Sequence, residues 1–144
     1  MVSRRPFFSR DAVLRAGDDE WSAMGESDWL EAFSHHPRIG DGGGAPAAGG
    51  SAMARSWSAL EQSAVASVGD EARIGLARLN HDYETRFGFI YIVSAAGKSA
   101  AELLDLARSR MHNDRDTELR VAAEEQRKIT RLRLERLLNP VAAA

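Results

Sequence analysis

The chain has 144 residues, of which 44% are hydrophobic, a size and composition that fit one domain with a real core. Its formal net charge is −2, so it lacks the basic field that attracts nucleic acid. It has no cysteine, which excludes disulfides, thiolate metal sites and cysteine nucleophiles and fits a reducing cytosol. No segment reaches the roughly 20 apolar residues of a membrane span. We therefore expect a cytoplasmic chain without membrane or nucleic-acid partners.

Helices are predicted at the beginning of the chain. Ser9 is a good helix N-cap, and the first helix is expected to end near Ala16-Gly17 because glycine often ends helices. An amphipathic segment follows, with a helix from Ser27 to Phe33. We expect that helix to stop at His36, because the proline after it disfavours helical geometry at the residue before.

A glycine-rich stretch from Gly40 to Gly50 has almost nothing to bury, and we expect it to be a mobile surface loop. Apolar residues then recur at helical spacing from Ala52 to Val68 and again from Asp70 to Phe87, with a glycine break between the two helices. Residues 139–144 are read as a tail.

The period changes between Phe87 and Val93, where a short apolar run looks like a strand without a partner strand. We therefore expect a buried extended segment. Ser99 and Glu102 form a capping box for a helix to about Met111, and a last helix is predicted from about Arg115 to Leu138. The pattern predicts an all-α, compact single-domain bundle over residues 1–144, with about six to eight helices and one buried extended segment.

Two charged residues fall on helix faces that should pack inward. On a helical wheel, Glu61 lies within about 40° of Trp57, inside an apolar stripe. Arg133 falls among Leu119, Ile129 and other apolar residues of the last helix, including Leu137. A buried carboxylate needs a partner or a shifted pKa, so the two residues either pair structurally or share a polar pocket that binds an anionic substrate.

His36 is the leading candidate for a catalytic side chain, because an imidazole on a stiff bend has a defined direction and a pKa near neutral. The same residues also fit a surface His-Pro that only ends a helix. A metal site built from His35, His36 and Asp41 is a weaker alternative, because adjacent histidines point in different directions. The stretch from Ile92 to Ser99 ends like a phosphate-binding loop but lacks its first glycine, so nucleotide binding is rejected.

Four ordered motifs together resemble the OHCU decarboxylases, the 2-oxo-4-hydroxy-4-carboxy-5-ureidoimidazoline decarboxylases of purine breakdown. They are residues 36–40 (HPRIG), 58–62 (SALEQ), 79–93 (LNHDYETRFGFIYIV) and the region from Asn113 to Leu134 that ends in LRL. The resemblance implies an all-α lyase, usually dimeric, that needs no cofactor or metal. It implies conversion of the ureidoimidazoline substrate to (S)-allantoin with release of CO₂, beside hydroxyisourate hydrolase and urate oxidase in uric acid degradation.

The resemblance also implies the site residues. His36 and Glu61 correspond to the family's catalytic residues. The substrate-binding residues would be Pro37, Ser58, Ala59, Leu60, Gln62, Tyr91, Ile92, Val93, Ser94, Ala95 and Arg133. Two other classes of function remain open on the sequence: a non-catalytic helical interaction module and, less favoured, a metal-dependent hydrolase.

Overall fold

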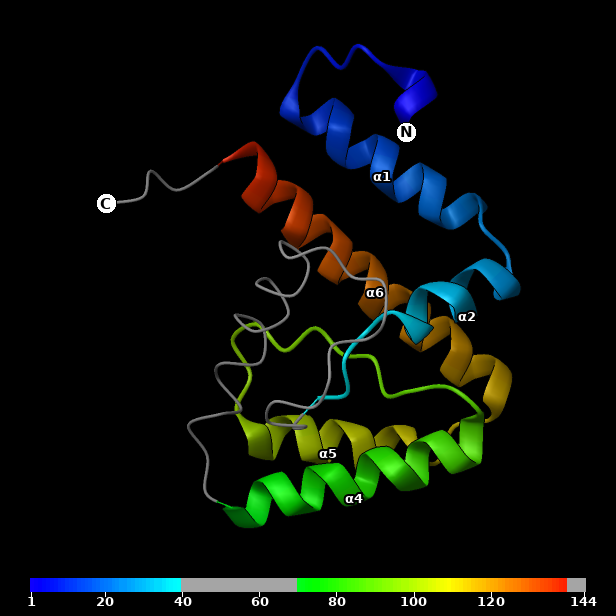
Figure 1. Cartoon of the computed structure of the whole chain (residues 1–144), viewed down its shortest axis with the longest axis vertical. Helices are drawn as coiled ribbons and strands as arrows, with labels where there is room; N and C mark the ends of the chain where they lie inside the picture. Colours follow the sequence, from blue (N-terminus) through cyan, green and yellow to red (C-terminus); the bar gives the residue numbers. More distant parts are fainter. Residues whose placement is uncertain (40–69, 140–144) are drawn as a thin grey trace.

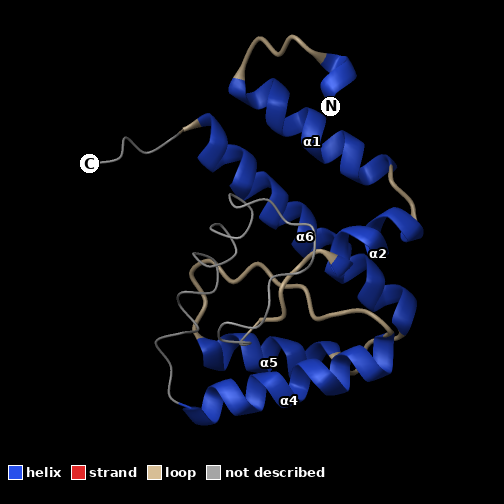
Figure 2. Ribbon diagram, in the orientation of Figure 1, coloured by secondary structure: helices blue, strands red, loops and turns tan. Residues whose placement is uncertain are grey.

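The computed structural model describes residues 1–39 and 70–139, and within them the chain is helical without any strand, which confirms the all-α prediction (Figure 2). The described residues form five α-helices and one short 3₁₀ helix, whereas about six to eight helices were expected for the whole chain. The helices are η1 (Val2–Arg4), α1 (Arg10–Ala23), α2 (Glu26–Ser34), α4 (Asp70–Phe87), α5 (Ala100–Arg110) and α6 (Arg115–Leu138). The predicted loop from Gly40 to Gly50, the predicted helix from Ala52 to Val68 and all of the tail after Asn139 lie outside the described residues.

Helix α1 begins as predicted but does not end at Gly17. Ser9 caps it by accepting a hydrogen bond from the Ala12 N–H at 3.1 Å, and the helix then continues to Ala23. Gly17 lies where α1 packs along α6 (Figure 1), and a Cβ there would come within 2.8 Å of Leu134 Cδ1. Gly17 therefore marks a close helix contact and not a helix end.

Helix α2 matches its prediction to within one residue at each end. The His36 N–H donates to the Phe33 carbonyl at 3.0 Å, and the chain then leaves the helix at Pro37. Trp21, near the end of α1, donates its indole N–H to the Ala123 carbonyl at 2.9 Å and so ties this end of the chain to α6. The position of the His-Pro bend is thus set by α2 and α6 together, which are also in contact.

Helices α4 and α5 lie side by side, and α4 has the predicted bounds (Figure 1). The capping box of α5 is formed as predicted: the Ser99 hydroxyl accepts from the Glu102 N–H, and a Glu102 carboxylate oxygen accepts from the Ser99 N–H at 2.6 Å. Lys98 donates to the Ser94 carbonyl, so this Gly-Lys-Ser sequence ends one segment and caps the next helix. The bounds of α6 are those predicted.

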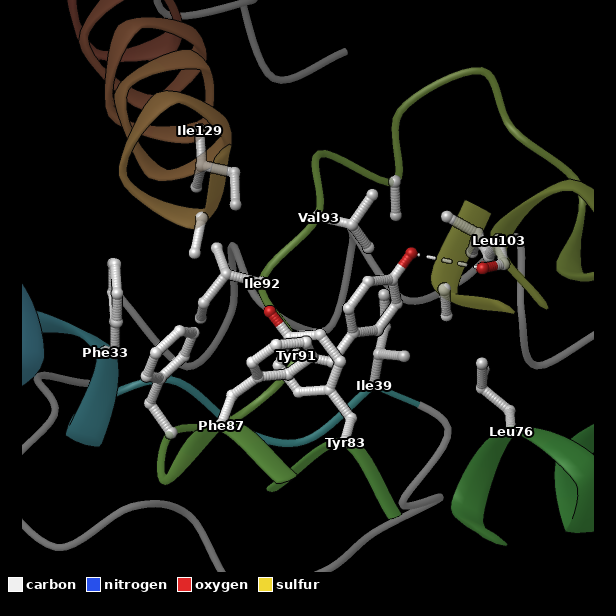
Figure 3. Packing of buried hydrophobic residues seen from close by; sticks show 14 of the residues in the cluster. Phe33, Ile39, Leu76, Tyr83, Phe87, Tyr91, Ile92, Val93, Leu103 and Ile129 are labelled. Atoms are coloured by element: carbon white, nitrogen blue, oxygen red, sulfur yellow. Dashed lines mark hydrogen bonds between the residues drawn. The ribbon is translucent and has the colours of Figure 1, made fainter. Parts of the chain in front are cut away.

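The core contains the extended segment that the sequence predicted. Gly88, at a φ of +82°, turns the chain out of α4, a conformation that side-chain-bearing residues rarely adopt. Phe89 and the residues from Tyr91 to Ala95 are buried, and the segment runs between α4 and α6 with its apolar side chains in the core (Figure 3). None of the described helices combines the length and apolar character needed to cross a membrane.

Candidate active site

The bend that carries His36 is held by its neighbours. Arg38 donates two hydrogen bonds to the Glu84 carboxylate, at 3.0 and 2.7 Å, and Glu84 lies on α4. Ile39 is buried in the core, and its carbonyl accepts a hydrogen bond from the Asn80 amide at 2.5 Å. Because Pro37 also has a fixed φ, the bend is restrained on both sides and the imidazole is presented from a rigid support.

The extended segment supplies a second wall, and side chains replace the missing partner strand. Arg110 donates to the Ile92 carbonyl at 2.8 Å. The Ser94 N–H donates to a Glu125 carboxylate oxygen at 2.7 Å, and the Ser94 carbonyl accepts from Lys98 at 2.8 Å. Buried backbone polar groups must find partners, and these three charged side chains supply partners for the extended segment.

Arg110 is itself fixed by a buried polar cluster. Its guanidinium pairs with Glu118, which also accepts from the Tyr83 hydroxyl and from the Asn113 amide at 3.0 Å. The guanidinium lies 4.8 Å from the centre of the Tyr91 ring. A satisfied network of this kind has one low-energy arrangement, so it fixes where the Ile92 backbone lies.

The Tyr91 side chain points into the core. Its hydroxyl donates to the Leu103 carbonyl at 3.1 Å (Figure 3), and burial raises its pKa to about 12. The hydroxyl of Tyr91 is therefore held at α5.

A pocket lies between the His-Pro bend, the extended segment and α6. Its described lining consists of His36, Pro37, Ile39, Tyr91, Ile92, Val93, Ser94, Ala95, Ala96, Ile129 and Leu132. The structure thus brings together His36, Pro37 and all five predicted residues of the extended segment. Sequence reasoning missed Ile39, Ala96, Ile129 and Leu132 as lining residues, although Ile129 was already placed on the inward face of the last helix.

The electrostatic setting of His36 favours a neutral ring. Burial is the main reason that the pKa of His36 is lowered to about 4, and the positive charge of Arg133 on α6 adds to this effect. His35 adds a smaller lowering, whereas Gln126 acts in the opposite direction. At neutral pH the described surroundings therefore present an imidazole that can accept a proton.

Arg133 is half-buried and sits close enough to His36 to affect its pKa, but it is not part of the described pocket lining. The inward face predicted for the last helix is buried at Leu119 and Ile129, as expected. It does not extend to Leu137, which is 53% exposed, because the inward-packed part of α6 ends before its last turn.

The remaining predicted site residues, Ser58, Ala59, Leu60, Glu61 and Gln62, lie outside the described residues, as does Asp41. The pairing of Glu61 with Arg133 therefore stays a prediction. Within residues 1–39 and 70–139, no group of three or more histidine and carboxylate side chains is arranged to hold a metal ion.

Comparison with known proteins gives one consistent result. Residues 1–135 match the family model described as OHCU decarboxylase. Over 143 residues the chain is 37% identical to "Uric acid degradation bifunctional protein TTL" of Arabidopsis thaliana. This alignment covers 99% of this chain and 43% of the Arabidopsis protein. It is 35% identical over 91 residues to a mouse protein named 2-oxo-4-hydroxy-4-carboxy-5-ureidoimidazoline decarboxylase, covering 62% of this chain and 51% of the mouse protein.

A solved structure titled "Crystal structure of OHCU decarboxylase in the presence of (S)-allantoin" superimposes with a TM-score of 0.76 at 33% identity, covering 94% of this chain and 85% of that one. The chain spans about half the length, or less, of the curated relatives that it matches.

Proposed function

Because the chain belongs to the OHCU decarboxylase family, we propose that it is a carboxy-lyase that converts 2-oxo-4-hydroxy-4-carboxy-5-ureidoimidazoline to (S)-allantoin in uric acid degradation, without a cofactor. The observation that carries the proposal is the pocket in which a half-buried, neutral imidazole lies beside the extended segment. Both walls come from motifs that the family resemblance singled out. The solved relative named for (S)-allantoin supports the product assignment.

The reaction needs little beyond positioning and proton transfer. When CO₂ leaves, the electron pair of the broken C–C bond remains on the carbon that bears the hydroxyl. The neighbouring C=N bond accepts this pair, so an enol forms and the nitrogen takes up a proton. The enol becomes a carbonyl when its hydroxyl loses a proton and the adjacent carbon gains one, and protonation from one face fixes the handedness of allantoin.

His36 is proposed to carry the proton that moves in this last step. A neutral imidazole can take the hydroxyl proton, and the imidazolium so formed can return it to the adjacent carbon. The low pKa of His36 supports this assignment, because the ring starts unprotonated and its conjugate acid gives up the proton readily.

The other site residues are proposed to hold the substrate. Glu61 would orient or deprotonate the hydroxyl, and Arg133 would bind the carboxylate or ureido group. Contacts to the substrate are further proposed for Pro37, Ser58, Ala59, Leu60, Gln62, Tyr91, Ile92, Val93, Ser94 and Ala95. The position of Arg133 beside His36 supports its role, because a guanidinium there attracts an anionic substrate to the imidazole.

The test generates the unstable substrate in situ from urate with urate oxidase and hydroxyisourate hydrolase, adds the protein, and follows optically active allantoin by circular dichroism. We expect rapid formation of the (S) product. His36→Ala should lower kcat by about 100-fold or more, the usual size of a general acid–base contribution, whereas His81→Ala, at an exposed position, should not. Slow racemic product from folded protein would instead favour the non-catalytic interaction module.

A homodimer in the cytosol is proposed as the working form, functionally linked to the two enzymes that supply the substrate. The lack of cysteine supports the compartment. Large apolar side chains near the beginning of the chain support the dimer, since Phe8 is 92% exposed and Val2 73% exposed. Light scattering after size exclusion would test it, and a mass equal to that of one chain would refute it.

A further inference from the structure

Gln126 is a buried polar side chain that the proposed reaction leaves unexplained. It is 5% exposed and lies on α6, one turn before Ile129, which lines the pocket. Its amide N–H donates to the Thr130 hydroxyl at 3.2 Å. Its carbonyl oxygen is buried and has no hydrogen-bond partner among the described residues. Such a group costs stability, which calls for a reason to retain it.

The surroundings of this oxygen point to the imidazole. Gln126 lies beside His36 and acts on its proton affinity, yet it does not belong to the described pocket lining. One ring nitrogen of a neutral imidazole donates and the other accepts, so a neighbouring amide carbonyl would accept from the ring N–H of His36.

We propose that Gln126 is the positioning residue of His36: its carbonyl oxygen accepts the N–H of one ring nitrogen in the working enzyme and so leaves the other nitrogen unprotonated toward the pocket. The hydrogen bond from the amide N–H to the Thr130 hydroxyl leaves the carbonyl oxygen available for this contact. The proposal rests on the proposed function for the role of His36, and it adds which tautomer the pocket selects.

The choice of an amide over a carboxylate fits the surrounding charges. Arg133 and His35 both disfavour a protonated His36, and Gln126 adds no negative charge to counter them. A carboxylate at this position would stabilise the imidazolium and remove the proton acceptor at neutral pH. Glutamine therefore orients the ring without charging it.

Histidine ¹⁵N NMR of the free, full-length protein tests the contact without any need for activity. The His36 signal is identified by its loss in His36→Ala. In the wild type we expect a neutral ring at pH 7 with one dominant tautomer. In Gln126→Leu the two tautomers should become mixed, and in Gln126→Glu the pKa of His36 should rise by about one unit or more.

Kinetics then tests the consequence for catalysis. Gln126→Leu should lower kcat at least tenfold with little change in KM or in the thermal midpoint, because leucine has a similar size and the site stays filled. Gln126→Glu should move the acidic limb of the kcat profile upward by the same amount as the His36 pKa. Asn139→Asp makes the same amide-to-carboxylate change at the exposed end of α6 and should alter neither quantity.

The possible results separate the two proposals. Unchanged tautomer populations and unchanged His36 pKa in both Gln126 variants would overturn the positioning role, whatever the activity. The expected NMR changes in a wild-type protein that makes no (S)-allantoin would support the contact and refute the proposed function instead. A fall in kcat that follows a fall in thermal midpoint in Gln126→Leu would show a structural role only and would also overturn the inference.

Discussion

Arg38 holds Glu84 through two hydrogen bonds of 3.0 and 2.7 Å, and this pair fastens the His-Pro bend to the side of α4. Both side chains are largely solvent-accessible, at 49% and 35% exposure. An exposed pair contributes little to stability, with a usual range of about 0 to 1 kcal/mol. Its effect on the position of His36 is therefore expected to exceed its effect on folding.

Arg38→Ala should lower kcat/KM by about tenfold while lowering the free energy of unfolding by about 1 kcal/mol or less. The matched control is Arg108→Ala, which removes another exposed ion pair, with Asp105 at 3.2 Å, on α5. The decarboxylation assay and urea unfolding measure the two effects. Equal kinetic effects of the two substitutions would show that the bend does not depend on Arg38.

The buried pair of Arg110 and Glu118 should separate stability from activity. Glu118→Ala leaves a buried guanidinium without its main partner and should cost about 3–5 kcal/mol of unfolding free energy. Replacing both residues, with Arg110→Met and Glu118→Leu, should recover most of that loss, because no buried charge remains. The double variant should still be slow in the decarboxylation assay, since the Ile92 carbonyl loses its donor. Full activity in the double variant would contradict the positioning of the segment by Arg110.

Two glycines of the α4 region should respond to alanine in opposite ways. A Cβ at Gly75, inside α4, would meet only the Leu104 methyl groups at 3.7 and 3.8 Å, so Gly75→Ala should raise the free energy of unfolding by about 0.5–1 kcal/mol through helix propensity. Gly88 has open space around it but a φ of +82°, so Gly88→Ala should lower that free energy by about 1–2 kcal/mol. Urea unfolding of the two variants checks the signs, and the same sign for both would contradict this account.

The lowered pKa of His36 makes stability depend on pH. An ordinary histidine in the unfolded chain has a pKa of 6.5, and the folded value is about 4, so between these values the unfolded state binds more protons. The stability from the neutral ring is fully present above pH 6.5 and is lost as the pH falls toward 4. At pH 5 the loss should be about 2 kcal/mol relative to pH 7.5.

Urea unfolding of His36→Gln at pH 7.5 and pH 5 measures how much His36 contributes to the pH dependence of the free energy of unfolding, because glutamine does not titrate. The difference between the two pH values should shrink by about 2 kcal/mol relative to the wild type. His81→Gln, at an exposed position on α4, is the matched control and should keep the wild-type difference. An unchanged pH dependence in His36→Gln would mean that the ring is not held neutral.

Much of this fold could be predicted because its signals are local. The bounds of α6, the Ser99–Glu102 capping box and the buried segment after Phe87 all follow from residues that are neighbours in the chain. Gly17 was misread because its meaning depends on Leu134, which is distant in sequence, and a local pattern cannot tell a glycine that ends a helix from one that admits a packed neighbour.

Some residues of the site could be predicted from the sequence and others could not. His36 and the wall from Tyr91 to Ala95 were marked by motifs, and the structure places them around one pocket. Arg110, Gln126 and Glu125 carried no such signal, since charged and amide residues on a helix look like a solvated face. The partners of Arg110 and Glu125 include backbone atoms of the extended segment, which only the folded arrangement brings within reach.

Glu125 and Glu124 are adjacent on α6 but have different partners. One of the Glu125 carboxylate oxygens accepts the Ser94 N–H at 2.7 Å and the other pairs with Lys128 at 2.6 Å, whereas adjacent Glu124 pairs with Arg127 on the surface. A hydrogen bond to a charged group contributes about 1.5–3 kcal/mol, and its loss frees the pocket wall at Ser94. Glu125→Ala should therefore lower kcat/KM by about tenfold or more, mainly through KM, while Glu124→Ala leaves both constants near the wild-type values. Steady-state kinetics of the two variants decides the point, and a similar KM for both would show that the wall keeps its position without Glu125.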